Sequence, residues 1–464
     1  MPVDCGVIGY SENSLFSKIM SRRRRNRKQL PEGPIRVDIE SFCHDGRGVT
    51  HVDGKATFVD GALPGEVVDI EFTEMKRDFA EARVTEVYEG SRFRTEPKCD
   101  YFELCGGCSF QHVDPERQIE VKQDLLAEQF RRIGRLDEVP LWDPLRGPVW
   151  GYRHKARLSV KYVEKKQKVL VGFREKRSRL LADMEHCEVL HPRVGRKLMD
   201  MAQLISGLSI RTQIPQIEVA MGDAECILVF RNLADPSAED LVLMREFGRL
   251  NDFRVYLQPK GPNSVVALGE YGRDLLSYSV PAHDVLFEFG PLQFVQVNPE
   301  MNRSMIDRAI DLLAPEADDH VIDLFCGIGN FTLPIARYAK RVVGVEGSRE
   351  LVAQAERNAE LNQLVNASFH VADLTADHGH QPWYRGTYSL ALLDPSRAGA
   401  EEILTCLPRW GVKRIVYVSC NPSTLARDAN ILVERFGYCL KGAGVMDMFP
   451  QTSHVESIAL FEKD

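Results

Sequence analysis

Long hydrophobic runs are missing from this sequence of 464 residues. No stretch of 18 or more consecutive apolar residues occurs, so no segment is suited to cross a bilayer as a helix. The N-terminus does not combine a charged start, an apolar stretch and a small-residue cleavage site, so we predict no secretory signal. We therefore expect a cytoplasmic protein without membrane contacts.

Disulfide bonds are not expected either. The chain has 11 cysteines, an odd number, and thiols stay reduced in the cytoplasm. Each cysteine is therefore a candidate for metal binding or catalysis. Apolar residues make up 44% and charged residues 27% of the sequence, which is typical of a globular protein. A chain of this length usually divides into two or three domains.

An excess of positive charge is missing from the sequence as a whole, since its net charge is −8. The segment 146–197 nevertheless contains 15 Lys and Arg against 5 Asp and Glu, a local balance of +10 that leaves −18 for the rest. Phosphates respond to local charge, so this segment is a candidate RNA-binding surface. Tyr152, Tyr162 and Phe173 lie within it and either stack on bases or are buried.

The first 92 residues divide into two parts. Residues 1–33 include a basic run, Arg22–Arg25, and we expect a disordered arm because like charges repel. The arm either grasps RNA or only keeps the protein in solution, and a third reading is that translation starts at Met20. Residues 34–92 contain short alternating apolar runs separated by glycines, which predict a small β-barrel or sandwich.

The rest of the chain is predicted to form two further domains. Residues 93–288 have a mixed α/β pattern, and their first helix begins at Asp114, a candidate N-cap that is followed by Pro115. Residues 289–464 alternate regularly between apolar strands and helices, which predicts a parallel α/β sheet.

Polar or glycine-rich segments follow five predicted strands of this last part. In open α/β sheets, ligands bind at the carboxyl ends of the strands. The segments and residues at these ends are Phe325–Asn330, Glu346, Asp373, Asp394 and Cys420. We therefore expect a ligand site at this edge.

The turn Phe325–Asn330 contains Gly327 and Gly329, which let the backbone approach a ligand at the start of a helix. A dinucleotide-binding turn would have its third glycine at Thr332, so that reading is disfavoured. Glu346 follows Gly327 by 19 residues and ends the next strand, where a carboxylate can hold ribose hydroxyls.

Cys420 and Glu456 suit covalent catalysis. Cys420 ends a strand just before a helix, a position that favours the thiolate. Glu456 opens an apolar strand, where a carboxylate is a candidate proton acceptor. A thiolate that adds to an electron-poor ring carbon makes the neighbouring carbon nucleophilic, and after that carbon has reacted a base must remove its proton. We expect His454 to be structural or to face RNA. The cysteines expected to be buried and inert are Cys326, Cys406 and Cys439.

A second group of cysteines has metal-ligand spacing. Cys99, Cys105 and Cys108 lie close together in the sequence, and their spacing suits zinc or an iron–sulfur cluster, each of which needs four ligands. Cys187 is the best candidate for the fourth ligand, and His112 is an alternative if the metal is zinc.

Several of these segments together resemble a known family, the uracil-5-methyltransferases of tRNA and ribosomal RNA. The segments that carry this resemblance are Phe294–Asn298, Asp394–Gly399, Ser419–Pro422 and His454–Ser457. In the first 92 residues, Gly46–Val49 and Pro64–Glu66 resemble a TRAM domain, an OB-like RNA-binding barrel.

The resemblance implies a class I methyltransferase fold with a mainly parallel seven-stranded sheet and S-adenosylmethionine as cofactor. It makes Cys420 the nucleophile and Glu456 the base. Asp373 stands where an amide is common in the family, but either group can accept from an adenine amino group. The residues that the resemblance places around the cofactor and the uracil are Gln296, Phe325, Gly327, Asn330, Glu346, Asp373 and Asp394.

The barrel, the cysteine loop and the methyltransferase domain occur in the order of a bacterial subgroup that makes 5-methyluridine in 23S ribosomal RNA. This resemblance implies a structural 4Fe–4S cluster on Cys99, Cys105, Cys108 and Cys187. We expect the protein to be a monomer. Three other readings remain open: the same chemistry on transfer RNA or another ribosomal site, a cytosine-5 methyltransferase, and a non-catalytic RNA-binding assembly factor.

Overall fold

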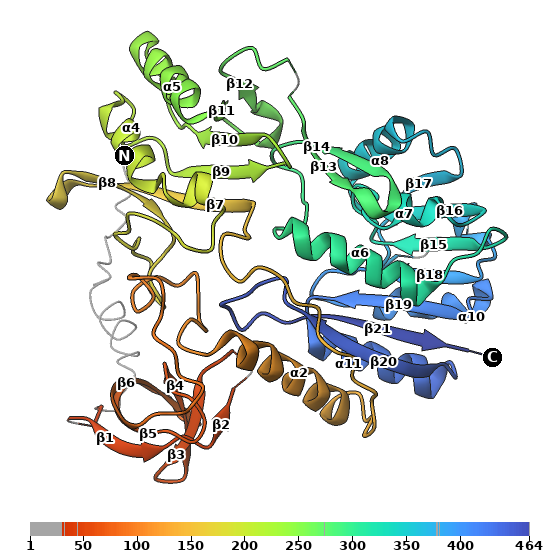
Figure 1. The fold of residues 1–464 in the computed structure, drawn as a ribbon, viewed down its shortest axis with the longest axis horizontal. Helices are drawn as coiled ribbons and strands as arrows, with labels where there is room; N and C mark the ends of the chain where they lie inside the picture. The colour runs from red at the N-terminus through yellow and green to blue at the C-terminus, as the bar shows by residue number, and fades with distance from the viewer. Residues whose placement is uncertain are drawn as a thin grey trace, which may run out of the picture. The chain divides into compact units, whose positions relative to one another are not determined.

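The computed structural model describes residues 30, 31, 33–43, 45–272, 274–376, 379 and 381–463. Most of the predicted basic arm, including Arg22–Arg25 and Met20, lies outside the described residues. The chain divides into two compact units between Arg92 and Phe93 (Figure 1), and each is described by itself.

The first unit is built from strands, as the sequence predicts. Its strands are β1 (Ile35–Asp38), β2 (Ser41–Phe42), β3 (Gly48–Val52), β4 (Lys55–Asp60), β5 (Val67–Met75) and β6 (Phe79–Glu89). They form one six-stranded sheet in the order β1-β5-β6-β4-β3-β2. Alternate residues of β4 and β5 are buried and form a separate hydrophobic core, which is the pattern of a sheet with one covered face.

The second unit begins with a mixed α/β part. A six-stranded sheet in the order β12-β11-β10-β9-β7-β8 packs against α4 and α5 and has its own core. Its strands are β7 (Lys155–Val163), β8 (Lys168–Gly172), β9 (Gln216–Met221), β10 (Cys226–Arg231), β11 (Arg254–Gln258) and β12 (Val266–Ala267). Its helices are α3 (Pro192–Gly195), α4 (Leu198–Gly207) and α5 (Ala238–Asn251).

Tyr152, Tyr162 and Phe173 of the basic segment lie in or beside this part. Tyr152 is buried and its hydroxyl donates to the carbonyl of Pro450 at 2.9 Å. Tyr162 and Phe173 are partly buried and pack against the core of the six-stranded sheet. Of the two interpretations of these aromatics, burial is the one that the structure supports.

A seven-stranded sheet forms the C-terminal part of the second unit, in the order β17-β16-β15-β18-β19-β21-β20. Its strands are β15 (His320–Leu324), β16 (Arg341–Glu346), β17 (Ala367–Val371), β18 (Leu390–Leu393), β19 (Arg414–Ser419), β20 (Cys439–Met446) and β21 (Glu456–Glu462). The first five are parallel, whereas β21 is antiparallel to both of its neighbours. The predicted mainly parallel seven-stranded sheet is confirmed.

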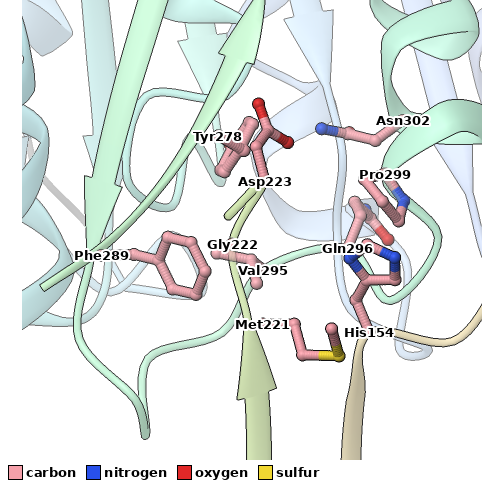
Figure 2. A pocket seen from close by; sticks show the side chains of 10 residues that line it. All are labelled: His154, Met221, Gly222, Asp223, Tyr278, Phe289, Val295, Gln296, Pro299 and Asn302. Carbon is pink, nitrogen blue, oxygen red and sulfur yellow. The ribbon is translucent and has the colours of Figure 1, made fainter. Parts of the chain in front are cut away.

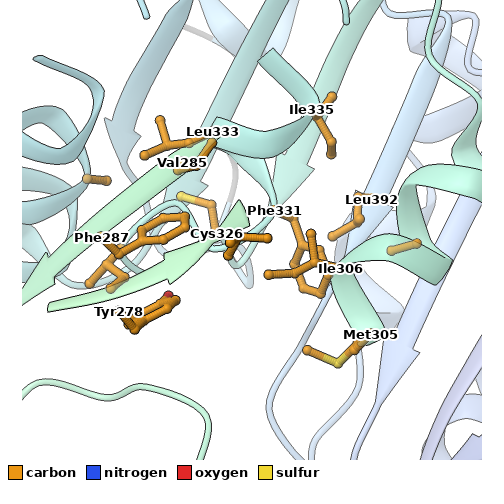
Figure 3. Packing of buried hydrophobic residues seen from close by; sticks show 14 of the residues in the cluster. Tyr278, Val285, Phe287, Met305, Ile306, Cys326, Phe331, Leu333, Ile335 and Leu392 are labelled. Atoms are coloured by element: carbon orange, nitrogen blue, oxygen red, sulfur yellow. The ribbon is translucent and has the colours of Figure 1, made fainter. Parts of the chain in front are cut away.

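Helices and a hairpin complete this part (Figure 1). The helices are α6 (Pro299–Leu313), α7 (Thr332–Ala336), α8 (Arg349–Leu361), α9 (Glu401–Leu404), α10 (Leu407–Trp410) and α11 (Pro422–Asn430), and the hairpin is β13 (Leu276–Val280) with β14 (Val285–Phe289). Figure 3 shows how side chains of the hairpin, α6 and α7 pack together with the sheet. This common core fixes the hairpin and α6 beside the end of β15.

The helix α2 (Pro115–Arg132) confirms the predicted N-cap, because the Asp114 carboxylate accepts from two backbone N–H groups of the first turn. It packs against β20 and α11, so a helix from the predicted central domain covers the C-terminal sheet. The predicted boundary between residues 288 and 289 stays a prediction.

One expectation about an individual side chain differs from the structure. Cys439 is exposed at the start of the edge strand β20, whereas Cys326 and Cys406 are buried as predicted. Within the described ranges, no helix combines the length and the apolar composition that a membrane crossing needs.

Candidate active site

The strand register brings the predicted site residues to one edge of the seven-stranded sheet. Leu324 is level with Val345 and with Leu393, so Phe325, Glu346 and Asp394 follow at the same height. The remaining two residues, Cys420 and Glu456, come from β19 and β21, which are antiparallel to each other. Ser419 pairs with Ser457, which places Cys420 and Glu456 at this edge from opposite chain directions.

The glycine-rich turn after β15 has an unusual backbone. Phe325, Gly327 and Gly329 all have positive φ, at +66°, +56° and +90°. A non-glycine residue in this region is strained, and such strain collects at ligand sites. A Cβ placed on Gly327 would meet no atom within 4 Å, so open space adjoins the turn.

Glu346 closes this turn on its other side. Its carboxylate accepts from the backbone N–H of Gly327 at 3.2 Å and from that of Ser348 at 2.9 Å. A carboxylate at a strand end beside an open glycine turn suits a ligand with ribose hydroxyls. These residues therefore fit the nucleoside part of S-adenosylmethionine.

Asn330, at the end of the turn, is engaged by protein partners. Its side-chain oxygen accepts from the Tyr278 hydroxyl at 2.9 Å and from Asn302 at 3.0 Å, and its amide nitrogen donates to Asn302 at 2.9 Å. These bonds tie the turn to β13 and α6. The structure thus gives Asn330 a bracing position next to the predicted cofactor site.

Gln296 lines a pocket that reaches the same region (Figure 2). Asn302, the partner of Asn330, is part of the pocket wall, together with Met221–Asp223 and Tyr278. Burial and the neighbouring His191 lower the pKa of His154, another lining residue, to about 4. This imidazole is therefore neutral near pH 7.

Asp373 lies at the tip of β17 and is exposed. Its carboxylate accepts from the backbone N–H of Thr375 at 3.0 Å and from the Thr375 hydroxyl at 2.7 Å. The carboxylate is thereby held in one orientation at the end of the strand.

Cys420 lies close to two carboxylates. It is partly exposed and directly precedes Asn421, the N-cap of α11. Burial raises the pKa of the Cys420 thiol to about 11, with further contributions from Glu456 and Asp394, while Arg397 opposes the shift. The expected lowering by the helix is not observed, because Cys420 lies before the N-cap and the neighbouring negative charges outweigh the helix end.

Asp394 lies in the same cluster. Burial raises the pKa of its carboxyl group well above the usual range, and the charges of Glu456 and Asp323 add to the effect. The raised pKa favours the protonated form of this carboxyl group, which can donate a hydrogen bond. The neighbouring loop is fixed by the buried carboxylate of Asp428, which accepts from the backbone N–H of Ala400 at 2.8 Å and from the Tyr417 hydroxyl at 2.6 Å.

Glu456 is 7% exposed at the start of β21. One carboxylate oxygen lies 3.5 Å from Nε2 of His454, whose ring packs edge-on against Phe449. The site therefore combines a thiol with two carboxyl groups, those of Glu456 and Asp394. Addition to a ring, proton removal and hydrogen bonding to the ring require such a set of groups.

The four cysteines that are predicted to bind a metal lie near one another, but their side chains do not have the arrangement of a metal site. Burial raises the pKa of Cys108 to about 12 and that of Cys187 to about 11, and in each case charges on other thiols of the group contribute. Cys99 and Cys105 are buried beside them, with their pKa values also raised by burial. Among the described residues, no group of three or more His, Cys, Asp or Glu side chains is placed so that it could hold a metal ion. Four thiols suit a thiophilic metal chemically.

Sequence reasoning missed several residues at this site. Lys122, Tyr278 and Asn302 come from segments far from the strand ends. The position of a lysine on the apolar face of a helix does not show which residues it will contact. Asp323 had a signal, since a carboxylate in an apolar strand is unusual. It is fully buried, and burial raises its pKa to about 7 although Thr332 donates to it.

Comparisons with known proteins point to one family. A family model described as tRNA (Uracil-5-)-methyltransferase matches residues 115–464, and a TRAM domain model matches residues 34–85. Similar relatives include 23S rRNA (uracil(1939)-C(5))-methyltransferases RlmD. The one from Methylococcus capsulatus is 53% identical over 95% of this chain and 99% of its own length. The one from Alkalilimnicola ehrlichii is 51% identical over 96% and 99%.

A solved structure confirms the fold. It is that of Pyrococcus abyssi tRNA (uracil-54, C5)-methyltransferase in complex with S-adenosyl-L-homocysteine, which is similar with a TM-score of 0.71 and 23% identity. The match covers 92% of this chain and 99% of that one. The class I methyltransferase fold and the TRAM domain predicted from the sequence are thus confirmed.

Proposed function

The chain belongs to the tRNA (Uracil-5-)-methyltransferase family, and from this premise we propose that its substrate is a uridine of 23S ribosomal RNA. It is an RNA uracil-5-methyltransferase that uses S-adenosylmethionine. The observation that carries the substrate proposal is the full-length similarity, 53% and 51% identity, to relatives that are named for this substrate. A ribosomal substrate places the enzyme in the cytoplasm, and we propose that it acts there as a monomer.

We propose that Cys420 and Glu456 perform the covalent chemistry. The Cys420 thiolate adds to carbon 6 of the uracil, and carbon 5 then accepts a methyl group. Glu456 takes the carbon 5 proton, after which the thiolate leaves by elimination. The proximity of Cys420, Glu456 and Asp394 at one sheet edge supports these roles. Bound S-adenosylmethionine supplies the electrophilic methyl group.

The remaining residues hold the reactants in place. Asp394, whose raised pKa favours its protonated form, is suited to donate to a uracil carbonyl oxygen, and Gln296 is assigned to the same ring. Glu346 and Asp373 present acceptors for ribose hydroxyls and for an adenine amino group. Phe325, Gly327 and Asn330 shape the turn around the cofactor. The target base must leave its stack to reach Cys420, and the TRAM domain and segment 146–197 are proposed to hold the RNA around it.

The four gathered thiols are proposed to carry a 4Fe–4S cluster with a structural role. Cys99, Cys105, Cys108 and Cys187 supply the four ligands that such a cluster needs. Iron and acid-labile sulfide analysis of anaerobically purified protein distinguishes this cluster from zinc, since zinc brings neither iron nor sulfide. Stoichiometric zinc without sulfide would overturn the assignment.

Methyl transfer from labelled S-adenosylmethionine tests the substrate and the roles together. Unmodified 23S ribosomal RNA and transfer RNA are offered separately to wild type, Cys420→Ala and Glu456→Gln, and the product nucleoside is identified. We expect 5-methyluridine in 23S RNA, no product with Cys420→Ala, and a covalent RNA adduct with Glu456→Gln. Label in transfer RNA alone overturns the substrate, whereas 5-methylcytidine or full activity of Cys420→Ala overturns the chemistry.

A further inference from the structure

The segment between β20 and β21, residues 447–455, delivers Glu456 to the site and is called the base loop here. It contains no helix or strand, so its position depends on contacts with other elements. Two of its groups bind one buried lysine. Lys122 of α2 donates to the Asp447 carboxylate at 2.7 Å and to the Phe449 carbonyl at 3.0 Å.

A buried lysine is an unusual residue to hold a loop in place. Its side chain is 0% exposed, and a buried ammonium group is costly unless it is paired and hydrogen-bonded. Burial lowers the pKa of Lys122, while Asp447 and, at longer range, Glu456 oppose that shift. The buried ammonium group therefore holds the start of the base loop through two hydrogen bonds.

Gln118 holds the next part of the base loop from the same helix, one turn before Lys122. Its amide nitrogen donates to the Gln451 side-chain oxygen at 3.1 Å, and its oxygen accepts from the Gln451 backbone N–H at 2.9 Å. The Gln451 carbonyl accepts from the backbone N–H groups of Ser109 and Phe110, both at 3.0 Å.

The backbone of Gln451 shows why these contacts are needed. Its φ is +67°, a left-handed conformation that a residue with a side chain adopts only when its surroundings impose it. Gln451 is also 1% exposed. The hydrogen bonds from Gln118, Ser109 and Phe110 are the contacts that hold this conformation, five residues before Glu456.

We propose that Lys122 and Gln118 are positioning residues for Glu456 that act on the elimination step of the reaction. This inference rests on the proposed covalent mechanism. In that step the Glu456 carboxylate binds the carbon 5 proton, and the electron pair of the C–H bond forms the double bond between carbons 5 and 6. The C6–S bond breaks, and its electron pair leaves with Cys420 as a thiolate. Methyl transfer precedes this step and does not use Glu456, so a displaced base loop leaves it unaffected.

The test separates positioning from folding by removing both charges of the buried pair. Lys122→Met alone would leave Asp447 buried without a partner, whereas Lys122→Met with Asp447→Leu replaces an ion pair by apolar side chains, a change that proteins often tolerate. Single turnovers with methyl-labelled S-adenosylmethionine and a 23S RNA fragment are stopped with denaturant. Labelled RNA that stays bound to protein and free methylated RNA are then quantified over time.

We expect the double variant to transfer methyl groups at a rate within about twofold of wild type. The labelled adduct should accumulate at least about tenfold above wild type, because displacing a general base slows the step that it catalyses, here elimination, by about 10²–10⁴. A matched control is Arg414→Met with Glu462→Leu. It removes a 2.8 Å ion pair at the opposite end of β19 and β21 and should release product as wild type does. Gln118→Met keeps Lys122 and is also expected to accumulate the adduct. If the double variant does not fold, this variant alone tests the positioning role.

Glu456→Gln in the same assay distinguishes a failure of the positioning role from a failure of the proposed covalent mechanism. If Glu456→Gln accumulates labelled adduct but the Lys122 double variant and Gln118→Met release product at the wild-type rate, these two residues only stabilise the fold. If Glu456→Gln itself forms no adduct, the proposed covalent mechanism fails, and the positioning role fails with it.

Discussion

At the scale of single residues, the nucleophile is in an environment that disfavours its reactive form. Burial, Glu456 and Asp394 raise the pKa of the Cys420 thiol to about 11, so the free enzyme holds it protonated near neutral pH. A thiol in this state is protected from alkylation and oxidation. Attack on uracil then requires that the thiol lose its proton when the substrate is bound.

The state of Cys420 can be measured by its alkylation. In the free enzyme the rate of iodoacetamide modification of the Cys420 peptide should rise about tenfold per pH unit from pH ~7 to ~9.5 without a plateau, because the thiolate fraction grows in that proportion below the pKa. Quantitative peptide mass spectrometry gives this rate for Cys420 separately from the other cysteines.

Charge variants of the same site serve as controls. Glu456→Gln removes a neighbouring negative charge and should speed alkylation at pH ~8, whereas Arg397→Ala removes the opposing positive charge and should slow it. A plateau at or below pH ~8 in wild type would show that the thiolate is already favoured in the free enzyme.

The site residues that could be predicted from the sequence are those that follow a strand directly. Glu346, Asp394 and Cys420 each end an apolar run, and parallel strands bring their ends together by geometry alone. Lys122 and Asn302 could not be predicted in this way, because their position depends on how separate helices dock onto the sheet. The reactivity of Cys420 was mispredicted because its neighbours Glu456 and Asp394 come from distant segments.

At the scale of elements, the cofactor edge depends on close packing behind the glycine turn. Gly344 lies in β16, and a Cβ at this position would come within 2.7 Å of the Phe369 ring and 2.9 Å of the Cys326 sulfur. Both neighbours are buried, so neither can move away freely. The absence of a side chain at this position lets β17 and the turn approach β16.

Gly344→Ala is therefore expected to lower the free energy of unfolding by about 1–3 kcal/mol, the usual cost of overpacking a core. Gly347→Ala is the matched control three residues later, since its Cβ would meet only the Ala372 carbonyl at 3.8 Å. Thermal unfolding of both variants beside wild type checks this. Equal melting temperatures for the two variants would mean that β17 yields to the added methyl group.

The element boundaries themselves were largely readable from the sequence. The N-cap at Asp114 and the strand start at Glu456 were both predicted. The packing of α2 on β20 was not, because an amphipathic pattern shows that a helix has a buried face without showing which surface covers it. That docking matters for function, since α2 carries Lys122 and Gln118 to the base loop.

At the scale of the whole molecule, a negative net charge coexists with binding to a polyanion. The segment 146–197 has a balance of +10 in a chain whose net charge is −8. Several of its basic side chains, including Lys161, Arg174 and Arg179, are exposed, whereas Tyr162 and Phe173 pack against the core of the six-stranded sheet. The segment is therefore equipped to bind phosphates through its exposed charges.

The exposed basic side chains of segment 146–197 predict a specific salt dependence of RNA binding. Replacing Lys161, Arg174 and Arg179 by alanine should weaken binding of a 23S RNA fragment, and the slope of log Kd against log salt between about 50 and 200 mM should fall by about 0.7 for each lost phosphate contact. Fluorescence anisotropy measures both quantities. The matched control replaces three exposed basic residues outside the segment, Lys340, Lys413 and Arg435. The two triple variants lose the same charge. An equal decrease of the slope of log Kd against log salt in both would mean that RNA binding depends on the net charge of the protein. A decrease confined to the first variant would mean that segment 146–197 contacts the phosphates.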